Sequence, residues 1–213
     1  MKLLFFDTET TGLPKSREPA YKGPNNWPHI VSISWVLQDG DRTERKSFIV
    51  KPNGWTIPEE STQIHGITHQ RAVTEGSYLS DVMLQFLLVE HDYIIAHNLD
   101  FDLNVVFNAC LWDLGIAMPD FGRRFCTMKF STDLLRLPLG NGRSGWKSPK
   151  LSELYKYVMN KDPQGQLHSS AYDTELLVEI VNNFRPFKAI LGLLGPADIP
   201  LNETNKRTRT IIL

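Results

Sequence analysis

Short apolar segments separated by polar turns predict three β-strands at the start of the chain. Residues 2–8 are almost continuously apolar, which is typical of a buried central strand. Residues 29–37 carry apolar side chains at every second position, and Asp39-Gly40 is a hairpin turn signal. Residues 44–51 are then expected to return, so the chain is predicted to begin with an antiparallel meander.

The later pattern is mainly helical. Apolar spacing predicts helices at residues 58–65, 80–90, 100–114, 151–159 and 170–184. A short buried strand is predicted at residues 93–96, and residues 125–137 carry a mixed strand and helix pattern. Strands followed by alternating helices and strands predict an α/β fold, in which helices cover a mixed sheet.

The composition is that of an ordinary globular protein. The 213 residues are 41% hydrophobic and 22% charged, which excludes wholesale disorder, a collagen and a disulfide scaffold. We expect one domain over residues 1–196 and a C-terminal tail over residues 197–213. No apolar run approaches the roughly 18–20 residues of a membrane helix, so we expect no membrane contact and a cytoplasmic location. Cys110 and Cys126 stand among apolar neighbours and are predicted to be buried thiols.

The net charge of -1 hides an uneven distribution. Residues 1–121 carry nine basic and sixteen acidic side chains, whereas residues 122–150 carry seven basic side chains against Asp133 alone. An acidic body with this basic strip suits a polyanion held beside a cation site, with few phosphates contacted. A solvated basic surface is the alternative interpretation.

Two carboxylates interrupt the first apolar strand. Asp7 and Glu9 are two residues apart, so both side chains point to the same face of a strand. Neighbouring like charges repel, and a divalent cation such as Mg²⁺ or Mn²⁺ would neutralise them through oxygen ligands. An exposed strand end with solvated acids is the alternative.

Three more candidates follow later elements. Asp102 comes just after the strand at residues 93–96, in a position where a helix start alone also favours an acid. His168 and Asp173 frame the last strong helix, where a capping box beginning at Ser170 or a surface histidine would explain them equally. Together the four acids can hold two divalent ions about 3.5–4 Å apart, with the histidine taking a proton from an attacking water.

The order and spacing of these residues form recognisable motifs. They are residues 5–13 (FFDTETTGL), 97–102 (HNLDFD) and 168–173 (HSSAYD), with a further element at residues 64–68 (IHGIT). The set resembles the DEDD 3′→5′ exonucleases, in the branch with a histidine in the third motif, which is the family of the proofreading subunit of bacterial DNA polymerase III. Ser170 stands where the family usually has alanine, a change that leaves the catalytic positions in place.

The resemblance implies a fold and a set of roles. The fold is ribonuclease H-like, a five-stranded mixed sheet flanked by helices, with the site at the end of the first strand. Two ions, Mg²⁺ or Mn²⁺, are implied, with Asp7 bridging both, Glu9 and Asp173 completing one site and Asp102 supporting the other, while His168 is the general base. The residues implied to hold the 3′-terminal nucleotide are Thr8, Thr10, Thr11, Leu13, His65 and Phe101. Core packing is an equal explanation for Leu13 and Phe101.

The implied activity is hydrolysis of the last phosphodiester of a single strand, DNA being favoured, with release of nucleoside 5′-monophosphates. A DNA polymerase or another replication or repair protein is a possible partner, and residues 197–213 could dock on one. RNA 3′-end processing, a hydrolase of another phosphoester and a non-catalytic module that binds 3′ ends remain as alternatives. A non-catalytic relative should lack one or more of the acids, and all are present here.

Overall fold

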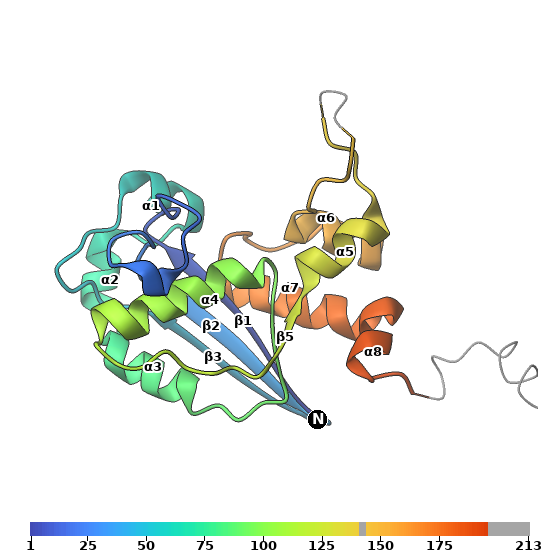
Figure 1. The fold of residues 1–213 in the computed structure, drawn as a ribbon, viewed down its shortest axis with the longest axis horizontal. Coiled ribbons are helices and arrows are strands. Elements are labelled where there is room, and N and C mark those ends of the chain that lie inside the picture. The colour runs from blue at the N-terminus through green and yellow to red at the C-terminus, as the bar shows by residue number, and fades with distance from the viewer. Residues whose placement is uncertain (141–143, 196–213) are drawn as a thin grey trace, which may run out of the picture.

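The computed structural model describes residues 1–140 and 144–195. At its centre is a five-stranded sheet in the order β3-β2-β1-β4-β5 (Figure 1). The strands are β1 (Lys2–Thr10), β2 (Ile30–Asp39), β3 (Arg42–Ile49), β4 (Tyr93–Ala96) and β5 (Arg123–Cys126). Strand β2 pairs antiparallel with both β1 and β3, whereas β4 pairs parallel with β1 and β5 pairs parallel with β4. This confirms the predicted meander and the predicted α/β fold with a mixed sheet.

Helices cover both faces of the sheet. The helices are α1 (Glu59–His65), α2 (His69–Glu75), α3 (Leu79–Leu87), α4 (Leu99–Asn108), α5 (Thr127–Leu135), α6 (Leu151–Met159), α7 (Ser170–Asn183) and α8 (Arg185–Leu191). Figure 1 shows α4 in front of the strands and α7 behind them. A short 3-10 helix (Ala20–Lys22) lies in the long loop that follows β1.

The structure differs from the predicted elements in four places. The helix expected over residues 100–114 is α-helical only to Asn108 and continues as a π-helical turn, Ala109–Asp113. The mixed pattern at residues 125–137 resolves into β5 followed directly by α5. Helices α2 and α8 have no counterpart in the predictions; each is seven residues long, which gives little room for a helical period to show.

Alternation along β1 divides the core between the two faces of the sheet. Leu3 and Phe5 belong to the core beneath α7, whereas Leu4 and Phe6 belong to the core beneath α3 and α4. Side chains alternate along a strand, so the next odd-numbered positions face α7 and Thr8 faces α4. This alternation decides which helix each polar side chain at the end of β1 can meet.

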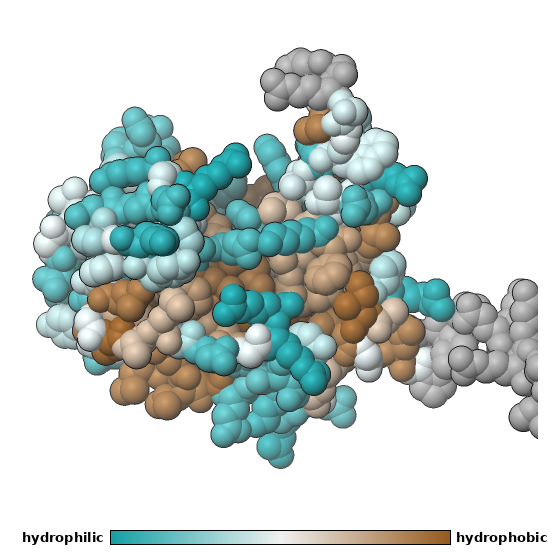
Figure 2. All heavy atoms as spheres, viewed as in Figure 1, coloured by the Kyte–Doolittle hydropathy of each residue, from teal (hydrophilic) through white to brown (hydrophobic). Residues whose placement is uncertain are grey.

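Some apolar side chains are exposed at the surface, whereas both thiols are buried. Figure 2 shows hydrophobic side chains at the surface over α3, where Leu84 is exposed, as is Leu88 directly after the helix. Cys110 and Cys126 are buried and free, as predicted. In the parts of the chain that the structure describes, no helix is both long and apolar enough to cross a membrane.

Candidate active site

Three carboxylates meet where the end of β1 faces the start of α7. Asp7 and Glu9 point from β1 towards α7, which carries Asp173 in its first turn. One carboxylate oxygen from each residue lies within 4.8 Å of the others. Glu9 and Asp173 are buried and Asp7 is half-buried. Two of these acids lie far from the third in sequence, and the docking of α7 on β1 brings them together.

The fourth predicted acid approaches from the other face of β1. Asp102 is in the first turn of α4 and is 3% exposed. Its Oδ1 accepts two hydrogen bonds from Thr8, one from the backbone N–H at 3.1 Å and one from the hydroxyl at 2.7 Å. Burial raises the pKa of Asp102 to about 7, although the bonds from Thr8 lower it. A solvated helix-start acid would have neither this burial nor these partners.

Burial raises the pKa values of all four acids, and the charges of neighbouring acids raise those of Asp7 and Glu9 further. Burial raises the pKa of Glu9 to about 8, and the charges of Asp173 and Asp102 add to the effect. Burial, followed by the charges of Asp102, Glu9 and Asp173, raises the pKa of Asp7 well above its usual value. Burial also raises the pKa of Asp173 to about 6, against the opposing effect of its hydrogen bond with the backbone of His168. Negative charge is therefore unfavourable here unless a cation compensates it.

The chemistry of this cluster fits a divalent cation. Oxygen ligands from carboxylates are those that Mg²⁺ and Mn²⁺ prefer. Within the described residues, Asp173 Oδ1 is buried without a hydrogen-bond partner, which leaves it free to coordinate an ion. The acidic cluster therefore indicates use of a divalent metal.

His168 lies on the loop that enters α7. Its backbone is left-handed (φ 61°), its side chain is exposed, and its N–H donates to Asp173 Oδ2 at 3.1 Å. The capping box expected to begin at Ser170 is wrong, because the N-cap is Ser169 and Ser170 is already inside the helix. Asp173 reaches back past the helix start to His168, and so fixes the backbone of the histidine beside the carboxylates.

Serine hydroxyls hold the start of α7 against the sheet. Ser170 is buried, and its Oγ lies 3.0 Å from Ser32 Oγ and 2.8 Å from Ser34 Oγ on β2. In the strand pairing Ser34 is opposite Asp7 and Ser32 is opposite Glu9. The serine at the position where the family usually has alanine is thus an anchor for α7. The sequence signal for this anchor is the pair of serines in an otherwise apolar strand, for which no role was predicted.

The loop after β1 carries several residues predicted to hold a nucleotide. Thr10 Oγ1 donates to Gly12 O at 2.7 Å, and Thr11 exchanges two 3.1 Å hydrogen bonds with the backbone of His29. Leu13 is 82% exposed, so the core-packing explanation is wrong for this residue. An apolar side chain held in solvent on this loop is available to contact a ligand.

His65 and Phe101 differ from Leu13 in being packed. His65 ends α1, is buried, and accepts a hydrogen bond from Ile67 N at 3.1 Å on Nδ1. Burial lowers the pKa of His65, against a raising effect from the backbone of Thr10. Phe101 is half-buried against the core beneath α4, and its ring centre is 5.8 Å from that of Trp27. Core packing and a place in the wall of the site are therefore both consistent with Phe101.

The basic strip of residues 122–150 is not one continuous surface. Arg123 begins β5 in register with Tyr93, over whose ring it lies at 5.5 Å, so it is at the end of the sheet away from the carboxylates. Lys129 and Lys147 are in ion pairs of 2.6 Å with Asp100 and Glu153. Arg143 lies outside the described residues. The charge count along the sequence could not show this, because it carries no information on pairing or position.

Comparisons with known proteins agree with the motifs and the fold. A sequence model described as exonuclease (RNase_T) matches residues 4–181. The 3′-5′ exonuclease DinG of Bacillus subtilis is 29% identical over 186 residues, which are 86% of this chain and 18% of that protein. A DNA polymerase III subunit epsilon-like protein of Rhodobacter capsulatus is 37% identical over 108 residues, 48% of this chain and 14% of that protein. The matched region thus spans less than a fifth of either relative.

Solved structures show the same ribonuclease H-like fold. E. coli exonuclease I in complex with a dT13 oligonucleotide has a TM-score of 0.68 at 18% identity, over 90% of this chain and 42% of that one. Exonuclease X in complex with 5′ overhanging duplex DNA has a TM-score of 0.54 at 24% identity, over 85% of this chain and 92% of that one. At these identities the likeness establishes the fold, and the match over residues 4–181 establishes that the chain belongs to the exonuclease family.

Proposed function

We propose that this chain is a metal-dependent 3′→5′ exonuclease that removes nucleoside 5′-monophosphates from the 3′ end of a single strand, with DNA as the favoured substrate. The observation that carries the proposal is the meeting of Asp7, Glu9 and Asp173 at the end of β1, with Asp102 held against the same strand. The chain belongs to the exonuclease family, and one of the proteins similar to it is a 3′-5′ exonuclease.

The four carboxylates are the proposed metal ligands. Asp7 would bridge two ions, Glu9 and Asp173 would complete one site, and Asp102 would support the second. Bound Mg²⁺ or Mn²⁺ supplies charge neutralisation at the scissile phosphate and lowers the pKa of water. Asp102 is fixed for this role by its two hydrogen bonds from Thr8.

His168 is the proposed general base. Its exposed imidazole would accept a proton from the water that attacks the last phosphodiester, and the O3′ of the preceding nucleotide would leave. Histidine is the side chain suited to such an exchange near neutral pH. The hydrogen bond from the His168 N–H to Asp173 would keep the base in place relative to the metal ligands.

The proposed binding site of the 3′-terminal nucleotide is formed by the end of β1, the loop that follows it, His65 and Phe101. Thr8, Thr10 and Thr11 would hold it through backbone and hydroxyl groups. The exposed Leu13 would wedge against its base, and the wall of the site would be formed by His65 and Phe101. A single strand can enter such a site, whereas a duplex end must first be frayed. We assign the activity to residues 1–196.

One experiment tests the function directly. A 5′-labelled single-stranded DNA and an RNA of the same sequence are incubated with the protein in Mg²⁺, Mn²⁺ or EDTA. Asp102→Asn is compared with Asp100→Asn, a matched change two residues away at an exposed acid paired with Lys129. We expect ladders shortened from the 3′ end for the wild type and Asp100→Asn, and none for Asp102→Asn or in EDTA.

The outcomes separate the alternatives. Faster shortening of the RNA than of the DNA would favour RNA 3′-end processing over a function on DNA. Binding of 3′ ends without shortening would leave a non-catalytic end-binding module. Retained activity in Asp102→Asn would overturn the assignment of the site. The similarity to a polymerase III epsilon-like protein makes a DNA polymerase the partner to test first.

A further inference from the structure

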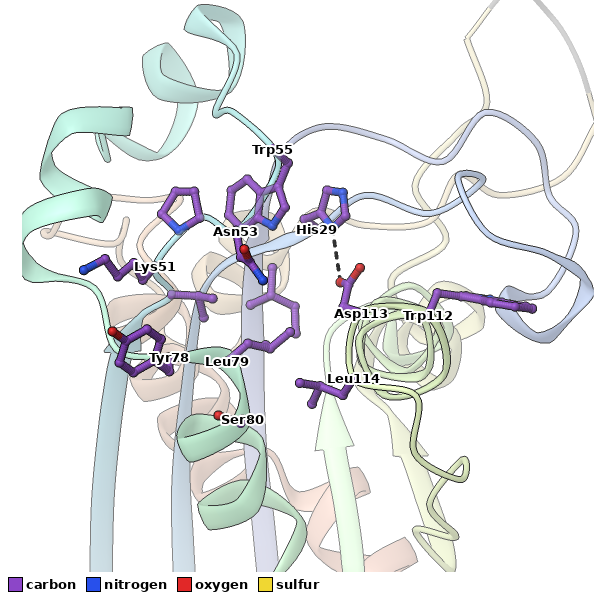
Figure 3. A pocket seen from close by; sticks show the side chains of 13 residues that line it. His29, Lys51, Asn53, Trp55, Tyr78, Leu79, Ser80, Trp112, Asp113 and Leu114 are labelled. Atoms are coloured by element: carbon purple, nitrogen blue, oxygen red, sulfur yellow. Dashed lines mark hydrogen bonds and ion pairs between the residues drawn. The ribbon is translucent and has the colours of Figure 1, made fainter.

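A second hollow opens at the same end of the sheet as the carboxylates. It is a cavity of about 560 Å³ between the start of β2, the loop after β3, the start of α3 and the end of the π-helical turn. We call it the aromatic pocket, and its characteristic side chains are His29, Lys51, Asn53, Trp55, Tyr78 and Asp113 (Figure 3). A cavity of this size is within the range of small-ligand sites.

The pocket offers flat aromatic surfaces. The rings of His29 and Trp55 are stacked, with centres 5.1 Å apart and planes 4° apart. Tyr78 is 66% exposed at the entrance to α3, and Figure 3 shows it on the side of the pocket opposite Asp113. Nucleic-acid bases stack on such side chains whatever their sequence, because every base has a π-face.

The polar groups of the pocket suit a phosphate and a base edge. Lys51 lies 5.6 Å from the centre of the Tyr78 ring and makes no ion pair within the described residues. Asn53 is exposed and contributes both hydrogen-bond donors and an acceptor. The carboxylate of Asp113 is engaged by His29 Nδ1 at 3.1 Å, so the acid is already paired.

The pocket adjoins the proposed binding site of the 3′-terminal nucleotide, because His29 lines the pocket and is hydrogen-bonded to Thr11. His29 in its wall exchanges two backbone hydrogen bonds with Thr11. His29 also lines a smaller hollow, together with Thr11, Leu13 and Trp27. Because nucleotides of a strand are covalently joined, a 3′ end held at Thr11 brings the preceding nucleotides towards this second cavity.

We propose that the aromatic pocket binds a nucleotide of the same single strand, 5′ to its 3′ end, through stacking on the aromatic side chains and contact of a phosphate with Lys51. This inference rests on the proposed function for the source of the strand. Such a site would determine how many nucleotides of the strand stay bound to the protein between successive cleavages.

The test separates binding from cleavage. The double variant Lys51→Glu/Tyr78→Ser removes the cation and the exposed ring. Its matched control is Arg123→Glu/Tyr157→Ser. The first change makes the same charge change at a cation lying over a tyrosine at the far end of the sheet, and the second removes a comparably exposed tyrosine on α6. Affinity for fluorescent dT12 is measured in EDTA at several salt concentrations, and the rate of dT12 and dT2 hydrolysis is measured in Mg²⁺.

We expect the pocket variant to bind dT12 about ten-fold more weakly than the control, with a salt slope reduced by about 0.7. Its hydrolysis of dT12 should slow more than that of dT2, since dT2 carries only one nucleotide 5′ to its 3′ end. Equal affinity for dT12 in the pocket variant and the control would overturn the inference, as would no binding of dT12 by the wild type. Binding that depends on Lys51 and Tyr78 in a wild type that cleaves neither substrate would instead support the pocket and reject the proposed exonuclease.

Discussion

Glu9→Gln removes one negative charge from the carboxylate cluster and keeps the size of the side chain. In the metal-free protein, burial and then the charges of Asp173 and Asp102 raise the pKa of Glu9 from 4.5 to about 8. The folded protein therefore retains this proton at pH values where the unfolded chain has released it. Between about pH 4.5 and pH 8 the folded state binds more protons, so its stability falls as the pH rises through this window.

The size of the effect follows from the pKa of Glu9. A rise from 4.5 to about 8 corresponds to a loss of about 5 kcal/mol of unfolding free energy above pH 8. In a protein of this length each kcal/mol changes Tm by about 2–4 °C. We expect the Tm of Glu9→Gln in EDTA to exceed that of the wild type by about 10–20 °C at pH 8.5, and to equal it below pH 4. Mg²⁺ should reduce the difference, because a bound cation stabilises the folded wild type.

The assay is thermal unfolding followed by circular dichroism from pH 4 to pH 9, in EDTA and in Mg²⁺. Glu60→Gln is the control, since Glu60 is an exposed acid in α1 outside the cluster. A difference in Tm between wild type and Glu9→Gln that does not vary with pH would refute the reasoning. The same pH-dependent gain in Glu60→Gln would refute it equally.

Three further changes test other parts of the site. Thr8→Val removes the hydroxyl bond that lowers the pKa of Asp102, so the acid limb of the rate against pH should shift upward, and an unmoved limb would contradict this. Ser34→Ala takes a partner from Ser170 and should cost about 1–3 kcal/mol in urea denaturation, a prediction that an unchanged midpoint would reject. Leu13→Ala should change stability by less than about 0.5 kcal/mol but lower the hydrolysis rate of the 3′-terminal nucleotide, and a fall in Tm at constant rate would count against the wedge.

Periodicity predicted the parts of the fold that have strong local patterns. The apolar run that becomes β1 is buried between two other strands, and the two acids that break it could be assigned to one face because strand side chains alternate. The motifs then indicated that Asp102 and Asp173 would join them. The structure places Asp173 in the cluster and Asp102 against Thr8 on the opposite face of the strand, a distinction that spacing alone does not make.

Features that depend on contacts between distant segments were not predictable in this way. The bonds from Ser170 to Ser32 and Ser34 form only once α7 packs on β2, and each serine alone is ordinary in sequence. The ion pairs of Lys129 and Lys147 likewise depend on which acids the fold brings close. Local composition describes a residue type and its neighbours along the chain, whereas these contacts are set by the packing of whole elements.

The docking of α7 on β1 has a consequence for the time at which the chain could become active. Asp7 and Glu9 emerge early in synthesis, but Asp173 comes from a helix near the end of the described fold. A nascent or partly unfolded chain in which α7 is detached holds its first two carboxylates without their third partner. Any activity of this cluster therefore belongs to the completed tertiary structure, because detachment of α7 separates Asp173 from Asp7 and Glu9.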